Sequence, residues 1–276
     1  MAQSLSLPVA EDSLVQLSAH FLLPEYPEEQ KTTELHRFES LLYATLMHAE
    51  SVEHPFNRLT QVSKLQPGSL RFRIFTWFTV HPTGYKAHGM VQIVDAKRKN
   101  IRVITLQEPA EPVKSVSYKT LDASHWMGMV YYDLIAVNKG KNSYYILLGF
   151  HGNDGLTHKK TIDVLTVSAN GTVKFGAPVF TQDQRTASRV IFEYRANAKM
   201  SLRYNEKSKM IVFDHLSPES PSLKGQYQYY VPDFSYDAFK LEKDKWVYVA
   251  DVYTKNDTEN KGKEGKKYDL ILPEKE

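Results

Sequence analysis

Residues 143–180 carry the pattern that most restricts how this chain can fold. An apolar run at 144–148 is followed by a turn rich in glycine and in acid or amide residues at 149–155, and a second run at 160–167 leads into Asn170-Gly171. Asn-Gly between β-forming residues is a strong hairpin signal, because both residues accept the positive φ of a type I′ turn. The stretch therefore predicts an antiparallel meander that includes a type I′ hairpin.

The same two-residue periodicity continues on both sides of this stretch. From residue 70 onward the apolar residues tend to alternate with polar ones, and no helix-length segments lie between the runs. The further strands that this spacing predicts are 70–80, 85–94, 101–106, 129–137, 189–194, 200–204, 210–213, 226–231, 238–242 and 246–252. Such a succession excludes a parallel α/β sheet. The expected fold class is mainly β, an antiparallel meander closed as a barrel, arranged as a small propeller or packed as two sheets.

The first 60 residues have a different period. Asp12 is suited to cap a short helix over 13–22, and the prolines that follow end it. A longer helix is predicted over 31–50, because apolar residues recur there at three or four positions, namely Leu35, Phe38, Leu42, Leu46 and Ala49. This apolar stripe is expected to pack against the β body, so we predict an N-terminal helical segment over 1–60.

The remainder, residues 61–276, is the predicted β body, and the two parts are expected to form one domain together. Near its end, residues 254–267 are charged and contain glycines but no apolar anchor, which predicts a solvated loop. The apolar run at 268–272 is expected to form a final edge strand.

Composition narrows the functional classes. The chain has 276 residues, of which 42% are hydrophobic, enough for a sizeable core. A net charge of +3 is too small and too dispersed to indicate nucleic-acid binding. Because the chain contains no cysteine, disulfides, thiolate metal sites and cysteine nucleophiles are excluded. No apolar run is long enough to predict a transmembrane helix, and we expect no cofactor.

Several phrases, taken in order, resemble an uncharacterised family of exported proteins from bacteria of the Bacteroidota. They are FRIFTW at 72–77, HWMGMVYYDLI at 125–135, YYILLGFHGND at 144–154, KKTIDVL at 159–165, FGAPVF at 175–180, MIVFDHLSP at 210–218 and YYVPDFSYDAFKLEKDKW at 229–246. The resemblance implies export, most simply to the periplasm, and it implies no established activity. The residues after Met1 also resemble a chain start left by signal-peptidase cleavage.

Ionisable residues near predicted strand ends are the candidate catalytic group. Asp214 and His215 are adjacent, and Asp233 and Asp237 follow in the next strand region. A carboxylate can orient a histidine for general-base work, although no Gly-x-Ser-x-Gly nucleophile elbow accompanies these residues. The turn at 151–155 superficially resembles a calcium loop but lacks the alternating acids of an EF-hand. We therefore predict no metal site.

Aromatic residues are the candidate ligand-binding group. A stacking platform for a sugar or peptide could be formed by Trp77, Trp126, Tyr229 and Trp246, with the neighbouring Tyr227 and Tyr230, although we expect most of these side chains to belong to the core. The leading expectation is a non-enzymatic exported module of the cell envelope that binds a partner protein or small ligand. The alternatives are a hydrolase of polysaccharide or peptide at Asp214, His215 and Asp233, and an accessory subunit that docks through the helix at 31–50.

Overall fold

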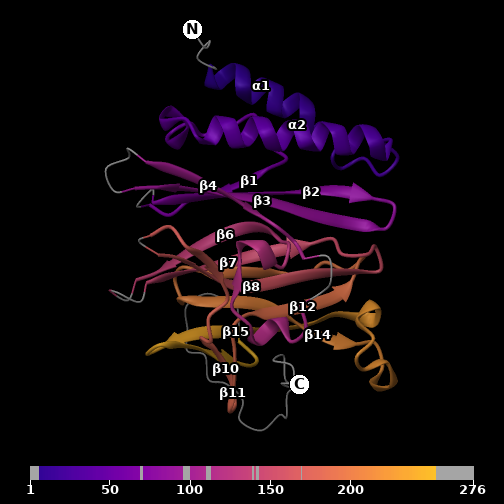
Figure 1. Cartoon of the computed structure of the whole chain (residues 1–276). Helices are drawn as coiled ribbons and strands as arrows, with labels where there is room; N and C mark the ends of the chain where they lie inside the picture. The colour runs from indigo at the N-terminus through magenta and orange to yellow at the C-terminus, as the bar shows by residue number, and fades with distance from the viewer. Residues whose placement is uncertain are drawn as a thin grey trace.

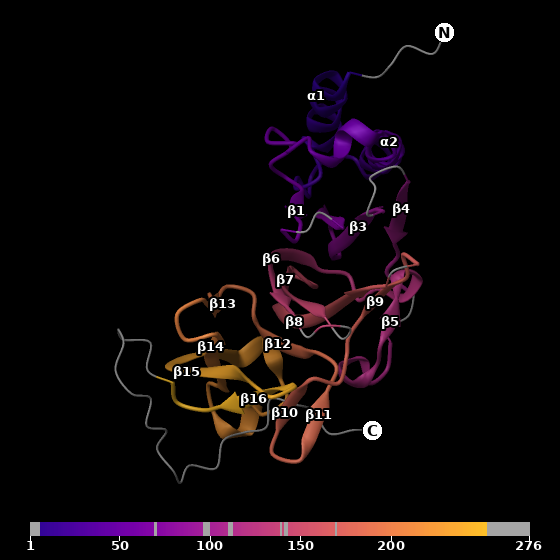
Figure 2. The same cartoon turned by 90° about the vertical axis from the view of Figure 1, so that its left-hand side faces the viewer.

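The computed structural model describes residues 6–68, 71–95, 100–109, 113–138, 140, 143–168 and 170–252. These residues form a layer of helices followed by three stacked sheets, and the layers succeed one another roughly in chain order (Figure 1). The view at right angles shows the same stack from its side (Figure 2). We call the sheets the helix-side, middle and C-terminal sheets. The predicted charged loop at 254–267 and edge strand at 268–272 lie outside the described residues.

The helical layer contains α1 (Leu7–Ser18) and α2 (Glu28–Leu46), with a short 3₁₀ helix, η1 (Ala49–Val52), after them. The predicted start of the first helix was wrong. Pro8 occupies the first turn, where its missing N–H costs no hydrogen bond, so the helix begins before Asp12. Asp12 instead lies inside the helix and pairs with Arg58.

The helix-side sheet has the order β1-β2-β3-β4, formed by Ser63–Leu65, Phe72–His81, Gly84–Val94 and Ile101–Leu106. Its central strand β2 is buried on both faces. Phe75 and Trp77 pack against the apolar stripe of the helices, whereas Phe72 and Ile74 pack against the middle sheet. This explains why apolar residues occur at both alternating sets of positions in β2.

The middle sheet has the order β5-β9-β8-β7-β6, and β12 pairs with the other half of the long strand β8. These strands are Leu121–Asp122 (β5), Val130–Val137 (β6), Tyr144–His151 (β7), Thr157–Val167 (β8), Val173–Phe175 (β9) and Val190–Arg195 (β12). The 3₁₀ helices η2 (Val116–Tyr118) and η3 (Ala123–His125) lie in the crossing that leads to it.

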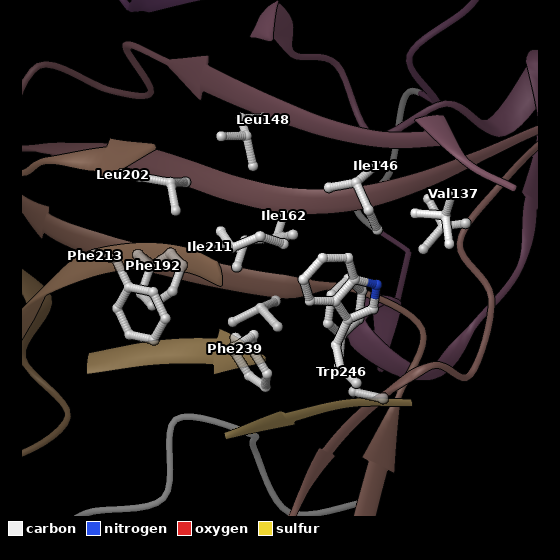
Figure 3. Close-up of a cluster of buried hydrophobic side chains, with 14 of the residues drawn as sticks. Val137, Ile146, Leu148, Ile162, Phe192, Leu202, Ile211, Phe213, Phe239 and Trp246 are labelled. Carbon is white, nitrogen blue, oxygen red and sulfur yellow. The ribbon is translucent and has the colours of Figure 1, made fainter. Parts of the chain in front are cut away.

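The C-terminal sheet has the order β11-β10-β16-β15-β14-β13 and includes one parallel pair, β10 with β16. Its strands are Phe180–Gln182 (β10), Arg185–Ala187 (β11), Leu202–Asn205 (β13), Met210–Pro218 (β14), Tyr230–Glu242 (β15) and Lys245–Val249 (β16), with η5 (Pro221–Leu223) and η6 (Tyr227–Tyr229) between β14 and β15. The middle and C-terminal sheets enclose the largest hydrophobic interior. Its labelled members, Ile162, Phe213 and Trp246 among them, meet between the two sheets (Figure 3).

The mainly β fold class with an N-terminal helical segment is confirmed. Among the described strands no sheet closes into a barrel, and the sheets stack face to face instead of radiating as propeller blades.

The predicted type I′ hairpin at Asn170-Gly171 was wrong in type. The Gly171 amide donates to Ser168 O at 2.9 Å, and Gly171 itself has a φ of +80°. Gly171 is therefore the last residue of the hydrogen-bonded turn and not one of its two central residues, as a type I′ turn at Asn170-Gly171 would require.

Candidate ligand-binding site

The three tryptophans do not form one stacking surface. Each is at most 1% exposed, and each lies in a different hydrophobic interior. Trp77 packs between the helices and the helix-side sheet, Trp126 between the helix-side and middle sheets, and Trp246 between the middle and C-terminal sheets. Tyr229 is half-buried in η6, where the Arg195 guanidinium lies 6.0 Å from its ring centre. The three tryptophans therefore fill the interiors between the layers, where large aromatic side chains bury much apolar area.

The predicted acid–histidine group is partly assembled at an irregularity in the pairing of β14 with β15. His215 lies at the register shift between Asp214 and Leu216. Its Nδ1 is 2.7 Å from Oδ2 of the buried Asp237, and its Nε2 is 3.9 Å from Oδ2 of Asp233. The structure therefore places the imidazole between two carboxylates.

Asp237 also accepts hydrogen bonds from the Tyr248 hydroxyl at 2.7 Å and from the Asp251 amide at 3.1 Å. These hydrogen bonds connect β14, β15 and β16, which is the arrangement expected of a structural network. Asp214 does not join it, because its Oδ2 accepts from the Ser201 amide at 2.7 Å. Asp214 thus caps the backbone that leads into β13.

A different group of residues lines an open cleft of about 500 Å³ at one end of the space between the middle and C-terminal sheets. The middle sheet contributes aromatic and basic side chains, and the turn between β12 and β13 closes the other side. The lining residues are Tyr132, Phe150, His158, Lys160, Tyr194, Ala196, Asn197, Ala198, Lys199 and Met200.

Strand alternation explains why this end of the interior is open and polar. His158, Lys160, Ile162 and Val164 are alternate residues of β8, so they share the face that looks toward the C-terminal sheet. Ile162 and Val164 are fully buried there, whereas His158 and Lys160 are half-buried. The hydrophobic interior therefore continues into the cleft, with two basic side chains where the apolar ones stop.

The aromatic walls hold the Lys160 side chain in place. Its Nζ lies 5.4 Å from the centre of the Tyr132 ring, a cation–π distance. The Tyr132 hydroxyl donates to Leu202 O at 2.9 Å, which fixes the ring across the two sheets. Burial lowers the pKa of Lys160, and the negative charge of Asp214 opposes that shift. Burial also raises the pKa of Tyr194 to about 12.

His158 contacts three aromatic rings, with Phe150 at 5.2 Å and Tyr194 at 6.0 Å between ring centres, and Tyr85 further away at 6.5 Å. Burial lowers the pKa of His158, which favours the neutral imidazole. The cleft therefore offers aromatic faces, a neutral imidazole and an ammonium group. This set can bind an apolar body and a polar or charged substituent.

The turn after β7 does not form a calcium loop. Asp154 Oδ1 accepts from the amides of Leu156 and Thr157 at 3.0 and 3.1 Å, and Asn153 donates to the Thr157 hydroxyl. The acid and amide groups thus satisfy their own backbone. Across the described part of the chain, no group of three or more His, Asp or Glu side chains is arranged to hold a metal ion.

Sequence reasoning missed the cleft, although one signal was present. In a strand whose inward positions are otherwise apolar, a lysine at 160 and a histidine at 158 depart from the pattern. A basic residue on an inward face requires either a buried partner or an opening to solvent. That departure could have identified Lys160, whereas the turn residues that close the cleft, 196–200, carry no such signal.

No protein-family model, no curated protein and no solved structure matches this chain. Among the described residues, neither helix combines the length and apolar character that crossing a bilayer requires.

Proposed function

We propose that the protein is a non-enzymatic binding module of the bacterial cell envelope, exported to the periplasm, and that its ligand occupies the cleft lined by Tyr132, Phe150 and Lys160. The observation that carries the proposal is the cleft itself. It is an aromatic-walled opening of about 500 Å³, a size typical of small-molecule sites, and it continues an ordered hydrophobic interior. The envelope location rests on the family resemblance described above.

A binding experiment tests the role of the cleft. Ligand-observed NMR with a panel of aromatic and sugar fragments is expected to detect binders that Tyr132→Ala weakens. Tyr132→Phe keeps the ring and should retain most binding, because it removes only the hydroxyl that donates to Leu202 O. Tyr227→Ala removes a partly exposed tyrosine that does not line the cleft and is the matched control. Binding that Tyr132→Ala leaves unchanged would place the ligand site elsewhere.

Export is tested separately. Antibodies raised against the protein, applied to fractions of the cells that make it, should detect it in the periplasmic fraction. Detection in the cytoplasmic fraction alone would contradict the envelope assignment without affecting the cleft.

A hydrolase of polysaccharide or peptide is the second candidate, favoured by the position of His215 between Asp237 and Asp233. In such an enzyme Asp237 would orient the imidazole and Nε2 would act as the general base. Turnover of chromogenic glycosides or peptides that His215→Asn abolishes would support this candidate. We favour the binding module because Asp237 is already shared among three donors and Asp214 is bonded to backbone.

The structure also bears on the accessory-subunit alternative. The stripe on α2 that was expected to serve as its docking element is buried inside the molecule, with Phe38, Leu42 and Leu46 fully inaccessible. A partner would therefore have to bind another surface.

A further inference from the structure

Lys160 lines the cleft from strand β8. On β8 it lies directly across from Phe150 of β7 on one side and Phe192 of β12 on the other. Two aromatic neighbours and the Tyr132 ring leave its ammonium group in surroundings that solvate a charge poorly. A half-buried ammonium of this kind favours an anionic partner.

The neighbouring Lys159 has an anionic partner of this kind, a carboxylate. Lys159, on the opposite face of β8, forms an ion pair with Glu193 at 3.6 Å. Among the described residues Lys160 forms no ion pair of its own, and the negative charge of Asp214 only partly offsets the effect of burial on its pKa. Asp214 is itself engaged by the Ser201 amide at 2.7 Å, which holds its carboxylate on the backbone.

The rest of the lining complements an anion that carries an apolar body. Lys199, exposed at the rim, adds a second positive charge, whereas no Asp or Glu is among the lining residues. Phe150 and Met200 supply apolar contact, and the neutral His158 can donate or accept one hydrogen bond. The positive groups and the aromatic walls are therefore on the same cleft, within reach of one small molecule.

We propose that the cleft binds a small amphiphilic anion, an apolar or aromatic ring that carries one carboxylate or phosphate, and that Lys160 receives the anionic group. This inference rests on the proposed binding function, because it names the ligand class of the same cleft. Carboxylate and phosphate present the same chemistry to an ammonium group, namely oxygen acceptors with negative charge.

Four probes that share a naphthalene ring and differ in charge distinguish the contribution of the charge to affinity from that of the apolar contact. They are 2-naphthoate, 2-naphthyl phosphate, uncharged 2-naphthalenemethanol and cationic 2-naphthylmethylammonium, each titrated into the full chain by calorimetry or fluorescence. The two anions are expected to bind tightest and the cation weakest. The better of the two anions identifies whether the natural ligand class carries a carboxylate or a phosphate.

Variants assign the effect to Lys160. Lys160→Met keeps most of the apolar stem and should weaken the better anion roughly tenfold, while leaving 2-naphthalenemethanol within about twofold. Lys160→Arg retains the charge and should preserve the order of the four probes. Lys174→Met, which removes an exposed lysine of β9, should change none of the affinities. Circular dichroism of each variant establishes that it is folded.

The possible failures are distinguishable. If none of the four probes binds, both the proposed function and this inference are overturned. If all four bind equally and Lys160→Met affects none, the cleft is an apolar site and only the anion inference fails. If the cation binds best, Asp214 rather than Lys160 determines the ligand charge, and the inference is likewise wrong.

Discussion

Arg189 Nε lies 3.2 Å from Asp163 Oδ1, in an ion pair from which both side chains are completely shielded from solvent. The guanidinium also donates to the carbonyls of Val116, Lys119 and Phe175, and Asp163 accepts from the Tyr131 hydroxyl at 3.3 Å. Burial raises the pKa of Asp163, and the Arg189 charge opposes that shift. This pair joins β8 and β12 to the crossing that contains η2.

Removing one member of this pair should be strongly destabilising. Arg189→Met leaves a buried carboxylate without its counter-charge, and we expect a loss of about 3–5 kcal/mol in the free energy of unfolding. The double variant Arg189→Met/Asp163→Leu removes both charges and should be less destabilised than the single variant. Urea denaturation of the wild type, both single variants and the double variant measures the difference. Additive losses in the double variant would show that the two residues act independently.

The helical layer should depend on the buried stripe of α2. Leu42 is fully buried among aromatic residues that include Phe75 and Trp77, so Leu42→Asp places an unpaired charge in that interior. We expect it to unfold or detach the layer, at a cost of at least the roughly 1.5–3 kcal/mol that burying the leucine contributes. Tyr43→Asp alters the adjacent position, which is 43% exposed, and is the control. Equal urea midpoints for Leu42→Asp and the wild type would contradict the docking.

The glycine of the β8–β9 hairpin should resist substitution for two reasons. Gly171 has a φ of +80°, and a Cβ there would lie 2.7 Å from Arg102 Nη1. Gly171→Val should therefore destabilise by roughly 1–3 kcal/mol from backbone strain alone, and by more if the arginine cannot move. Gly155 has a φ of +83° with no atom within 4 Å of the added Cβ, so Gly155→Val measures the strain without the contact. A larger loss in Gly155→Val than in Gly171→Val would refute a role for Arg102.

Acid should weaken the attachment of α2 to the helix-side sheet. The hydrogen bond with His81, at 2.6 Å, lowers the pKa of Glu28 below its ordinary value of 4.5. A carboxyl whose pKa is lower in the folded state stabilises that state above the unfolded pKa, and the contribution disappears as the pH falls through the folded pKa. The unfolding free energies of wild type and Glu28→Gln should therefore differ at pH 6, above the ordinary pKa of 4.5, and the difference should shrink as the pH falls below that value and through the folded pKa. A difference that does not shrink in acid would exclude ionisation of Glu28 as its source.

Local periodicity was enough to identify most strands and the second helix. Alternation at Phe72 and Ile74, and again at Ile162 and Val164, marks residues whose side chains share a face whatever lies opposite. The apolar stripe on α2 predicted its docking for the same reason. The first helix was misplaced because Asp12 carries a capping signal that competes with Pro8, and Pro8 is the residue that lies at the start of the helix.

The candidate site could be predicted only in part. The pairing of His215 with Asp237 joins residues 22 apart in sequence, and it depends on the register irregularity between β14 and β15. The sequence around Lys160 marked it as a basic residue on an inward face, but nothing in that sequence indicated which residues would surround it. Tyr132 and Met200 meet it from other strands and from a turn, and no short-range pattern relates those positions.

By itself the sequence determined the secondary-structure class, the two-residue period of the body and the presence of an amphipathic helix, because each follows from the spacing of apolar side chains along one segment. Only the tertiary structure decided that the sheets stack as layers, that Trp77, Trp126 and Trp246 fill separate interiors, and that the interior opens beside Lys160. The physical reason is that periodicity specifies which face of a strand is apolar. Packing between segments distant in the chain decides which element lies against that face. The same packing decides where the face becomes accessible to solvent.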